Sequence, residues 1–258
     1  MKFRPCIDIH NGKVKQIVGG SLKDEGNHAE ENFVSEQGGA FFADFYRSLG
    51  ISGGHIILLN KEGSEFFEAT KKQALAALRT YPGGMQVGGG ITAENAEEYL
   101  KAGASHVIVT SYVFRDGEIN LKRLERLKET VGKEHLVLDL SCRKKEDGYY
   151  IVTDRWQKYT KVKLEKEALE YFSGFCDEFL IHAVDVEGKA SGIESKIAGL
   201  LGSFGKCPVT YAGGVHSFED LKELKRLGQD RVDVTIGSAL DLFGGDMELE
   251  KVIEFCRA

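Results

Sequence analysis

Short apolar runs alternate with longer stretches of helical periodicity along the whole chain. The apolar runs span four to six residues and are bounded by glycine or polar residues, which is typical of buried strands. We expect eight such strands, at residues 5–9, 55–59, 85–88, 106–110, 135–139, 178–183, 209–212 and 232–236. Stretches between them repeat apolar residues at helical spacing, as at 68–80, 121–131, 164–173 and 193–204. This alternation predicts an α/β fold, a (β/α)8 TIM barrel, whose active site lies at the carboxyl ends of the strands.

Two glycine-rich segments half a chain apart resemble each other. Residues 87–92 read VGGGIT and residues 211–217 read YAGGVHS, and their matching glycines are 124 positions apart in a chain of 258 residues. Each segment follows a predicted strand and opens a predicted helix, with Thr92 or Ser217 as the N-cap. The strand that follows each segment also ends alike, at VTS in residues 109–111 and IGS in residues 236–238. These similarities predict a barrel with a two-fold internal repeat of half-barrels.

A strand that ends in glycines and leads into a helix can bind a phosphate. Its backbone N–H groups and the helix N-terminus attract an anion without a charged side chain. One such segment could equally be a tight turn, whereas two in matching positions favour phosphate binding. The candidate phosphate-binding residues are Gly89, Gly90, Thr110, Ser111, Gly213, Gly214, Gly237 and Ser238. We therefore predict a small-molecule bis-phosphate substrate that lies across the barrel mouth.

Two carboxylates occupy matching places in the two predicted halves. Asp8 ends the first strand and Asp139 ends the fifth, 131 positions later. Taken singly, each could close a turn, because aspartates are common at such positions. As a pair that faces one cavity, they favour general acid and base catalysis if their surroundings separate their pKa values.

The segment 140–163 is unusually long for this chain, and its length predicts a lid or a binding element. Its middle, residues 148–156, has the alternation of a hairpin. Trp156 either packs against the barrel rim or stacks on a planar heterocycle. In the second case, Arg143 would lie near an anionic or carboxamide group.

Composition and charge narrow the class of protein. The chain has 42% hydrophobic and 29% charged residues and three prolines, which fits one domain over residues 1–258. A net charge of −6 argues against a broad nucleic-acid or membrane surface, so anion binding must be local. The first strand follows Met1 almost directly, which leaves no room for a targeting segment and predicts a cytoplasmic protein.

The five cysteines are scattered and form no CxxC pair. His182 and Glu187 follow the sixth strand, so we expect them at the barrel mouth as binding residues. Neither is spaced from another His or Cys as zinc ligands are. We therefore expect no disulfide framework and no metal.

Seven segments resemble the ProFAR isomerases of histidine biosynthesis, and together they cover essentially the whole chain. They are PCIDIH at 5–10, VGGGI at 87–91, VTSYVF at 109–114, VLDLSCRK at 137–144, WQ at 156–157, HAVDVEG at 182–188 and YAGGV at 211–215. The chain is most similar to the eukaryotic-type branch. His182 and Glu187 stand where most bacterial members have a threonine and a second aspartate.

The resemblance implies an Amadori rearrangement, which converts an aminoaldose to an aminoketose. Asp139, as the acid, would protonate the ribose ring oxygen, and Asp8, as the base, would remove the C2′ proton. The resemblance implies no cofactor, because the iminium intermediate itself accepts the electron pair. Trp156 would stack on the aminoimidazole ring, and we expect the enzyme to be a monomer.

Three other hypotheses stay open at this point. The cyclase subunit of imidazole glycerol phosphate synthase also resembles the chain at Asp8 and the glycine segments, but it carries a lysine where this chain has Gln16. That cyclase would also need a glutaminase partner. A phosphosugar-binding barrel without catalysis would not require both aspartates. An isomerase of this kind could also act on the anthranilate analogue of the tryptophan pathway.

Overall fold

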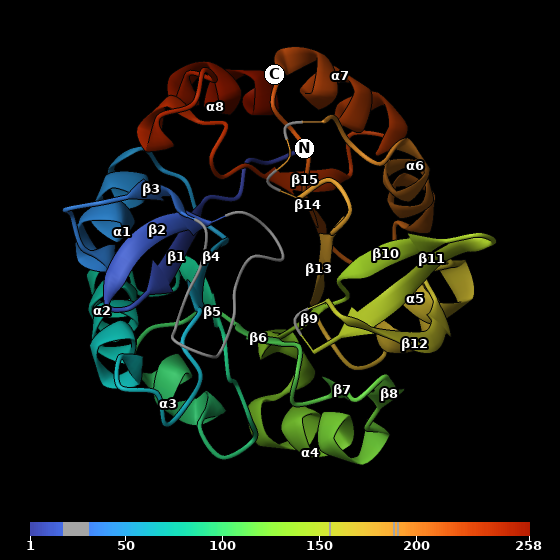
Figure 1. The fold of residues 1–258 in the computed structure, drawn as a ribbon, viewed down its shortest axis with the longest axis horizontal. Coiled ribbons are helices and arrows are strands. Elements are labelled where there is room, and N and C mark those ends of the chain that lie inside the picture. Colours follow the sequence, from blue (N-terminus) through green and yellow to red (C-terminus); the bar gives the residue numbers. More distant parts are fainter. Residues whose placement is uncertain (18–30, 155, 188, 190) are drawn as a thin grey trace.

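Eight parallel strands form the centre of the structure, a computed structural model that describes residues 1–17, 31–154, 156–187, 189 and 191–258. Each strand lies within one residue of its predicted bounds. The strands are β1 (Cys6–His10), β4 (Gly54–Leu58), β5 (Met85–Gly88), β6 (Val107–Val109), β9 (Leu136–Asp139), β13 (Glu178–His182), β14 (Val209–Ala212) and β15 (Val232–Thr235). Figure 1 shows them around a common centre, with the helices outside.

The sheet closes into a barrel. Its strands follow the order β15-β14-β13-β9-β6-β5-β4-β1, and every neighbouring pair in this series is parallel. The residues just before β1 complete the ring, because the Arg4 N–H donates to the Val234 carbonyl at 2.8 Å and the Val234 N–H donates to the Lys2 carbonyl at 2.9 Å. The predicted (β/α)8 barrel is thereby confirmed.

The helices cover the outside of this barrel (Figure 1). They are α1 (Gly39–Ser48), α2 (Phe67–Thr80), α3 (Ala96–Lys101), α4 (Leu121–Val131), α5 (Lys166–Phe172), α6 (Ser195–Phe204), α7 (Phe218–Leu227) and α8 (Leu249–Arg257). The helices predicted at 68–80, 121–131, 164–173 and 193–204 are confirmed within two residues, as α2, α4, α5 and α6. Two short antiparallel additions, β2 (Lys13–Ile17) with β3 (Glu31–Val34) and β7 (Phe114–Arg115) with β8 (Glu118–Ile119), were not predicted.

The two glycine segments lead into helices that begin differently. Ser217 caps α7 as predicted, in a reciprocal capping box with Asp220. The prediction for Thr92 is wrong, because α3 begins only at Ala96. Thr92 instead makes cap-like contacts in the turn that precedes α3, because its Oγ1 accepts from the Glu94 N–H at 3.2 Å and its own N–H donates to Asn95 Oδ1 at 2.8 Å.

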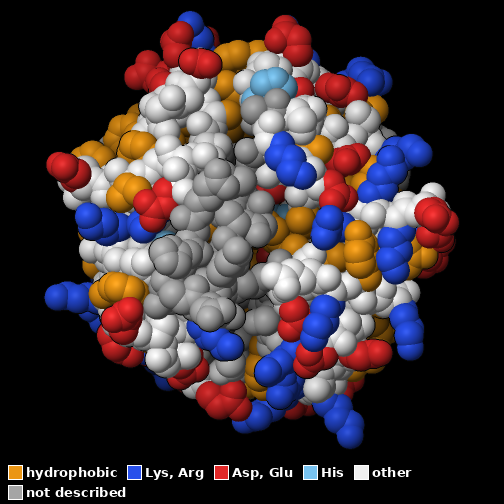
Figure 2. All heavy atoms as spheres, viewed as in Figure 1, with side chains coloured by type: hydrophobic (Ala, Val, Ile, Leu, Met, Phe, Trp, Pro, Cys, Tyr) orange, Lys and Arg blue, Asp and Glu red, His pale blue; other side chains and the backbone are white. Residues whose placement is uncertain are grey.

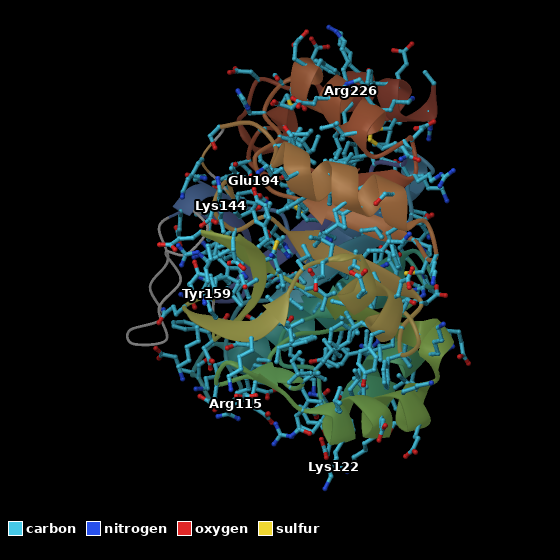
Figure 3. All side chains as sticks on the ribbon, turned by 90° about the vertical axis from the view of Figure 1, so that its right-hand side faces the viewer. Arg115, Lys122, Lys144, Tyr159, Glu194 and Arg226 are labelled. Carbon is cyan, nitrogen blue, oxygen red and sulfur yellow. The ribbon has the colours of Figure 1, made fainter. Side chains whose placement is uncertain are left out.

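The long segment after β9 forms a three-stranded antiparallel sheet. Its strands are β10 (Cys142–Lys145), β11 (Gly148–Thr153) and β12 (Lys158–Lys163). The hairpin predicted within 148–156 is therefore too short, because β11 pairs with strands on both sides of that range. Lys144 and Tyr159, labelled in Figure 3, lie on this sheet, on the side of the molecule that faces the viewer in Figure 1.

The inside of the barrel has its own small apolar layer. Ile108, Val137, Leu180 and Ala212 are buried together, apart from the larger core between strands and helices. Side chains two positions apart on a strand point to the same face. The residues two positions further along β9 and β13 therefore also point inward, above this layer, at the carboxyl ends of the strands.

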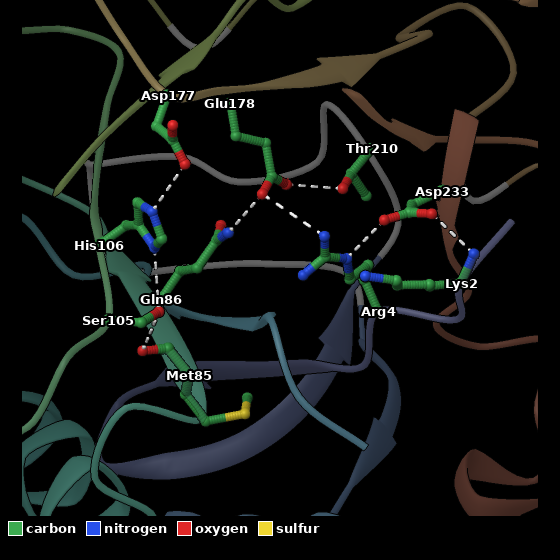
Figure 4. Close-up of polar contacts among 10 residues, drawn as sticks. All are labelled: Lys2, Arg4, Met85, Gln86, Ser105, His106, Asp177, Glu178, Thr210 and Asp233. Atoms are coloured by element: carbon green, nitrogen blue, oxygen red, sulfur yellow. Dashed lines mark hydrogen bonds and ion pairs between the residues drawn. The ribbon is translucent and has the colours of Figure 1, made fainter. Parts of the chain in front are cut away.

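A polar network fills the opposite, amino end of the barrel (Figure 4). Arg4 Nε donates to Asp233 Oδ2 at 2.8 Å, and Arg4 Nη2 lies 3.7 Å from Glu178 Oε2. The Glu178 carboxylate also accepts hydrogen bonds from Gln86 Nε2 at 3.0 Å and from Thr210 Oγ1 at 2.8 Å. The Glu178 side chain is only 5% exposed, so these partners take the place of water around its carboxyl group.

We expect Glu178→Ala to lower the free energy of unfolding by about 3 kcal/mol, because it leaves buried donors without their acceptor. Urea unfolding followed by circular dichroism measures this. The control is Lys222→Ala, which removes an exposed ion pair with Glu219 and should leave the midpoint nearly unchanged. An unchanged midpoint in Glu178→Ala would show that the network does not stabilise the barrel.

Candidate active site

The predicted catalytic and binding side chains gather at the carboxyl ends of the strands. Asp8 lies on β1, Asp139 is the last residue of β9, and His182 is the last residue of β13. Glu187 follows β13 in a turn. Because parallel strands end at the same rim, these four groups from three parts of the chain lie at one end of the barrel.

Asp139 is surrounded by hydrogen-bond donors. Its Oδ1 accepts from Ser141 Oγ at 2.8 Å and faces His182 Nδ1 at 3.2 Å, and its Oδ2 accepts from Thr110 Oγ1 at 3.3 Å. Burial alone would raise the pKa of Asp139. The positive charge of His182 and these hydrogen bonds outweigh that effect and hold the pKa below its ordinary value. Asp139 is therefore a carboxylate at neutral pH.

His182 is the positive centre of the site. Burial favours its neutral form, but the charge and hydrogen bond of Asp139, followed by the charges of Glu187 and Asp8, raise its pKa to about 9. The imidazole therefore carries a proton on each nitrogen at neutral pH, with Nδ1–H directed at Asp139.

Asp8 is in a different environment from Asp139. Burial and the nearby charge of Glu187 raise the pKa of Asp8 to about 7, although His182 acts in the opposite direction. Burial likewise raises the pKa of Glu187, and its Oε2 has no hydrogen-bond partner among the described residues. The surroundings thus shift the two aspartate pKa values in opposite directions, raising that of Asp8 and lowering that of Asp139, which is the condition for distinct acid and base roles.

Two further side chains at this site, Cys6 and His55, were missed by the sequence analysis. Cys6 lies two positions before Asp8 on β1, and His55 is its direct partner on the adjacent strand β4. One ligand atom from each of these three residues lies within 4.8 Å of the other two. Burial lowers the pKa of His55 to about 3, so its ring is neutral. Cys6 and His55 come together through the pairing of two strands, and the spacing of residues along one strand cannot reveal that pairing.

The two glycine segments adopt the same conformation. The φ angles are +98° and +72° at Gly89 and Gly90, and +115° and +78° at Gly213 and Gly214. Close packing also requires glycine at two of these positions. A Cβ would lie 2.1 Å from the Leu58 carbonyl oxygen at Gly89 and 2.0 Å from a backbone oxygen at Gly214. Both glycine segments therefore form tight turns, and their binding of phosphate stays a prediction.

The other candidate phosphate ligands differ in availability. Thr110 donates its hydroxyl to Asp139, so this group is already engaged. Ser111 is exposed and Ser238 is half-buried at the rim. Gly237 lies against Gln16, since a Cβ there would be 2.2 Å from Gln16 Oε1.

Trp156 lies beside the catalytic candidates. It occupies the turn between β11 and β12 with a φ of +68°, is half-buried, and its ring centroid is 5.9 Å from that of His182. Arg143 Nε donates to Asp185 Oδ1 at 3.0 Å, and its Nη1 donates to the Trp156 carbonyl at 3.4 Å. Arg143 is thus paired with a carboxylate and holds the turn that carries Trp156.

A family model described as histidine biosynthesis protein matches residues 2–247. The chain belongs to this family. Its relatives include a protein of Medicago truncatula, 53% identical over 257 residues, which are 98% of this chain and 81% of the relative. A Neurospora crassa protein is 44% identical over 260 residues, 99% and 98% of the two chains, and a Saccharomyces cerevisiae protein is 42% identical over 263 residues, 99% and 97%.

All three relatives are named 1-(5-phosphoribosyl)-5-((5-phosphoribosylamino)methylideneamino)imidazole-4-carboxamide isomerase, and the Medicago name adds "chloroplastic". In this member of the histidine biosynthesis family, the described residues include no helix long and apolar enough to cross a membrane. On the face drawn in Figure 2, Lys and Arg side chains are interspersed with Asp and Glu around the rim.

We expect Asp139→Asn to lower the pKa of His182 from about 9, because the variant removes the negative charge that stabilises the imidazolium. Imidazole nitrogen chemical shifts followed against pH by NMR measure this directly. Ser141→Ala is the matched control, since it removes a neighbour of Asp139 but keeps the charge, and the pKa should fall less. Titration of His182 below its ordinary 6.5 in the unmodified chain would contradict the assignment.

Proposed function

We propose that this chain catalyses the isomerisation for which its relatives are named, the conversion of the aminoaldose ProFAR to the aminoketose PRFAR. Two findings together carry the proposal. One is the similarity over the full length of the chain, and the other is a pair of aspartates at one barrel mouth, of which Asp8 has a raised pKa and Asp139 a lowered pKa. Residues 1–258 would act as one barrel domain on a small-molecule phosphoribosyl substrate.

The acid in our proposal is Asp139 together with His182. Asp139 is held as a carboxylate by three donors, so the proton available for transfer is on His182. With Nδ1–H bound to Asp139, the imidazolium would give its Nε2 proton to the ribose ring oxygen. The bond from that oxygen to C1′ then breaks, and the nitrogen lone pair forms the iminium. This shifts the donor role from Asp139 itself, as first expected, to the pair.

Asp8 is the base in our proposal. A carboxylate with a pKa of about 7 is ionised at slightly alkaline pH and still basic enough to accept the C2′ proton. The C–H electron pair moves toward the iminium and gives an enaminol. The enaminol then loses its O–H proton and gains one at C1′, which yields the ketone. Two protons are added and two removed, and the oxidation of C2′ to a ketone is matched by the reduction of C1′, so the isomerisation needs no external electron carrier.

The remaining candidate residues would hold the substrate. We propose that Gly89, Gly90 and Ser111 bind one phosphate, and that Gly213, Gly214, Gly237 and Ser238 bind the other. Binding energy from these remote ends would position C2′ between the acid pair and Asp8. Trp156 would cover the aminoimidazole beside His182, and Glu187, whose buried Oε2 is unpartnered among the described residues, would accept a ribose hydroxyl.

Two finer statements belong to the same proposal. We expect the enzyme to act as a monomer, because each catalytic candidate comes from this one chain. We also expect it to act in the cytoplasm, although the Medicago relative is named chloroplastic. The cyclase alternative is less favoured, because the lysine it requires is replaced by Gln16, a buried amide that donates to Cys6 Sγ at 3.5 Å.

We expect Asp8→Asn and Asp139→Asn each to reduce kcat on ProFAR by about 10³-fold, because a positioned acid or base contributes ~10²–10⁴-fold. Both variants should still bind PRFAR. Asp177→Asn, which changes an aspartate just before β13 at the amino end of the barrel, is the control and should keep full activity.

A spectrophotometric assay with ProFAR, run with and without ammonia, makes this measurement. Conversion to the ketose without ammonia supports the isomerase. Consumption of PRFAR only when ammonia is present would contradict it in favour of the cyclase.

A further inference from the structure

A mixed set of metal-ligating side chains lies inside the barrel beneath the mouth. Cys6 and Asp8 are two positions apart on β1 and therefore point to the same face, and His55 opposes Cys6 in the parallel pairing of β1 with β4. One ligand atom from each residue, a sulfur, a carboxylate oxygen and an imidazole nitrogen, lies within 4.8 Å of the other two. These are the three donor types that Zn²⁺ accepts.

We propose that Cys6, Asp8 and His55 form a binding site for a thiophilic divalent cation such as Zn²⁺, and that occupation of this site inhibits the enzyme. Binding replaces the proton of the Cys6 thiol with the Cys6–Zn bond and releases that proton to solvent, so there is no redox change. A solvent molecule takes the fourth position, on the mouth side.

The geometry requires only a small contraction. Bonds of about 2.3 Å to sulfur and about 2.0–2.2 Å to nitrogen and oxygen place tetrahedral ligand atoms roughly 3.5 Å apart, about 1 Å closer than the present limit. Strands β1 and β4 are paired along their length and fix the backbone positions of the three ligands, so the proposal requires the change to come from side-chain rotation.

The surroundings of the three ligands also suit a cation. Gln16 Nε2 lies 3.5 Å from Cys6 Sγ and can donate to the thiolate once the metal is bound. The carboxyl groups of Glu187 and Asp139 act electrostatically on this region, while the imidazolium of His182 opposes a positive ion. Cys6 and His55 are each 5% exposed, and Asp8 is half-buried, so entry is from the mouth.

Inhibition follows from the use of Asp8. A carboxylate oxygen bonded to a metal cannot accept the C2′ proton. This consequence rests on the proposed function, whereas the binding site itself does not.

The test begins with direct binding. The purified full chain is titrated with Zn²⁺ against a chromophoric chelator, and with Co²⁺ to look for the thiolate-to-cobalt charge-transfer absorption. We expect 1:1 binding with that absorption. Cys6→Ser should weaken binding at least about 100-fold, since loss of even an outer-shell partner costs ~10–100-fold. Cys207→Ser, which changes a half-buried cysteine outside this set, is the matched control and should bind as the unmodified chain does.

His55→Gln provides a second variant with the same expected loss, and circular dichroism checks that each variant is folded. Equal Zn²⁺ affinity in folded Cys6→Ser and in the unmodified chain, or no charge-transfer band, would overturn the metal site. Turnover is then measured with Zn²⁺ and after chelation. Reversible loss of kcat/KM supports the full proposal, whereas binding without inhibition would keep the site and contradict Asp8 as the base.

Discussion

The contact between His182 Nδ1 and Asp139 Oδ1 favours the charged forms of two of the four titratable groups considered at the barrel mouth. It joins the ends of two neighbouring strands, β9 and β13, at a distance of 3.2 Å. Asp139 keeps His182 protonated, and His182 keeps Asp139 ionised. The same imidazolium partly offsets the burial and repulsion that raise the pKa of Asp8. One hydrogen bond thus lowers the pKa of Asp139 and raises that of His182, as our proposal of a separate proton donor and proton acceptor requires.

This arrangement depends on the barrel being closed and in register. Inward-pointing side chains repeat every second residue, so the apolar layer at Val137 and Leu180 places Asp139 and His182 in the next layer toward the mouth. At the other end, the network of Arg4, Glu178 and Asp233 joins the first strand to the last. The candidate catalytic groups and the stabilising polar network therefore occupy opposite ends of one barrel.

Local patterns in the sequence were sufficient to predict much of the fold. Apolar runs located every barrel strand within one residue, and the repeated glycines located two turns with matching φ angles. Predictions from local patterns failed where another contact determines the start of a helix, the extent of a sheet or the register of two strands. Thr92 has the residue type of an N-cap, but its side chain accepts from Glu94 in the turn before α3, which begins only at Ala96. The sheet β10–β12 extended beyond the expected hairpin because pairing continued on both sides of β11. The approach of His55 to Cys6 depends on strand register, which one sequence alone does not specify.

The most direct test of this account is the pH dependence of kcat/KM for ProFAR. We expect a rise through about pH 7 as Asp8 loses its proton and a fall through about pH 9 as His182 loses its own, with both limbs belonging to the coupled group of Asp8, Asp139, His182 and Glu187. In His182→Gln the alkaline fall should disappear, and the acidic limb should move to higher pH because a positive charge near Asp8 is lost. His216→Gln, outside this group, should keep the original profile. An alkaline limb that persists unchanged in His182→Gln would contradict the role of His182 as the proton donor.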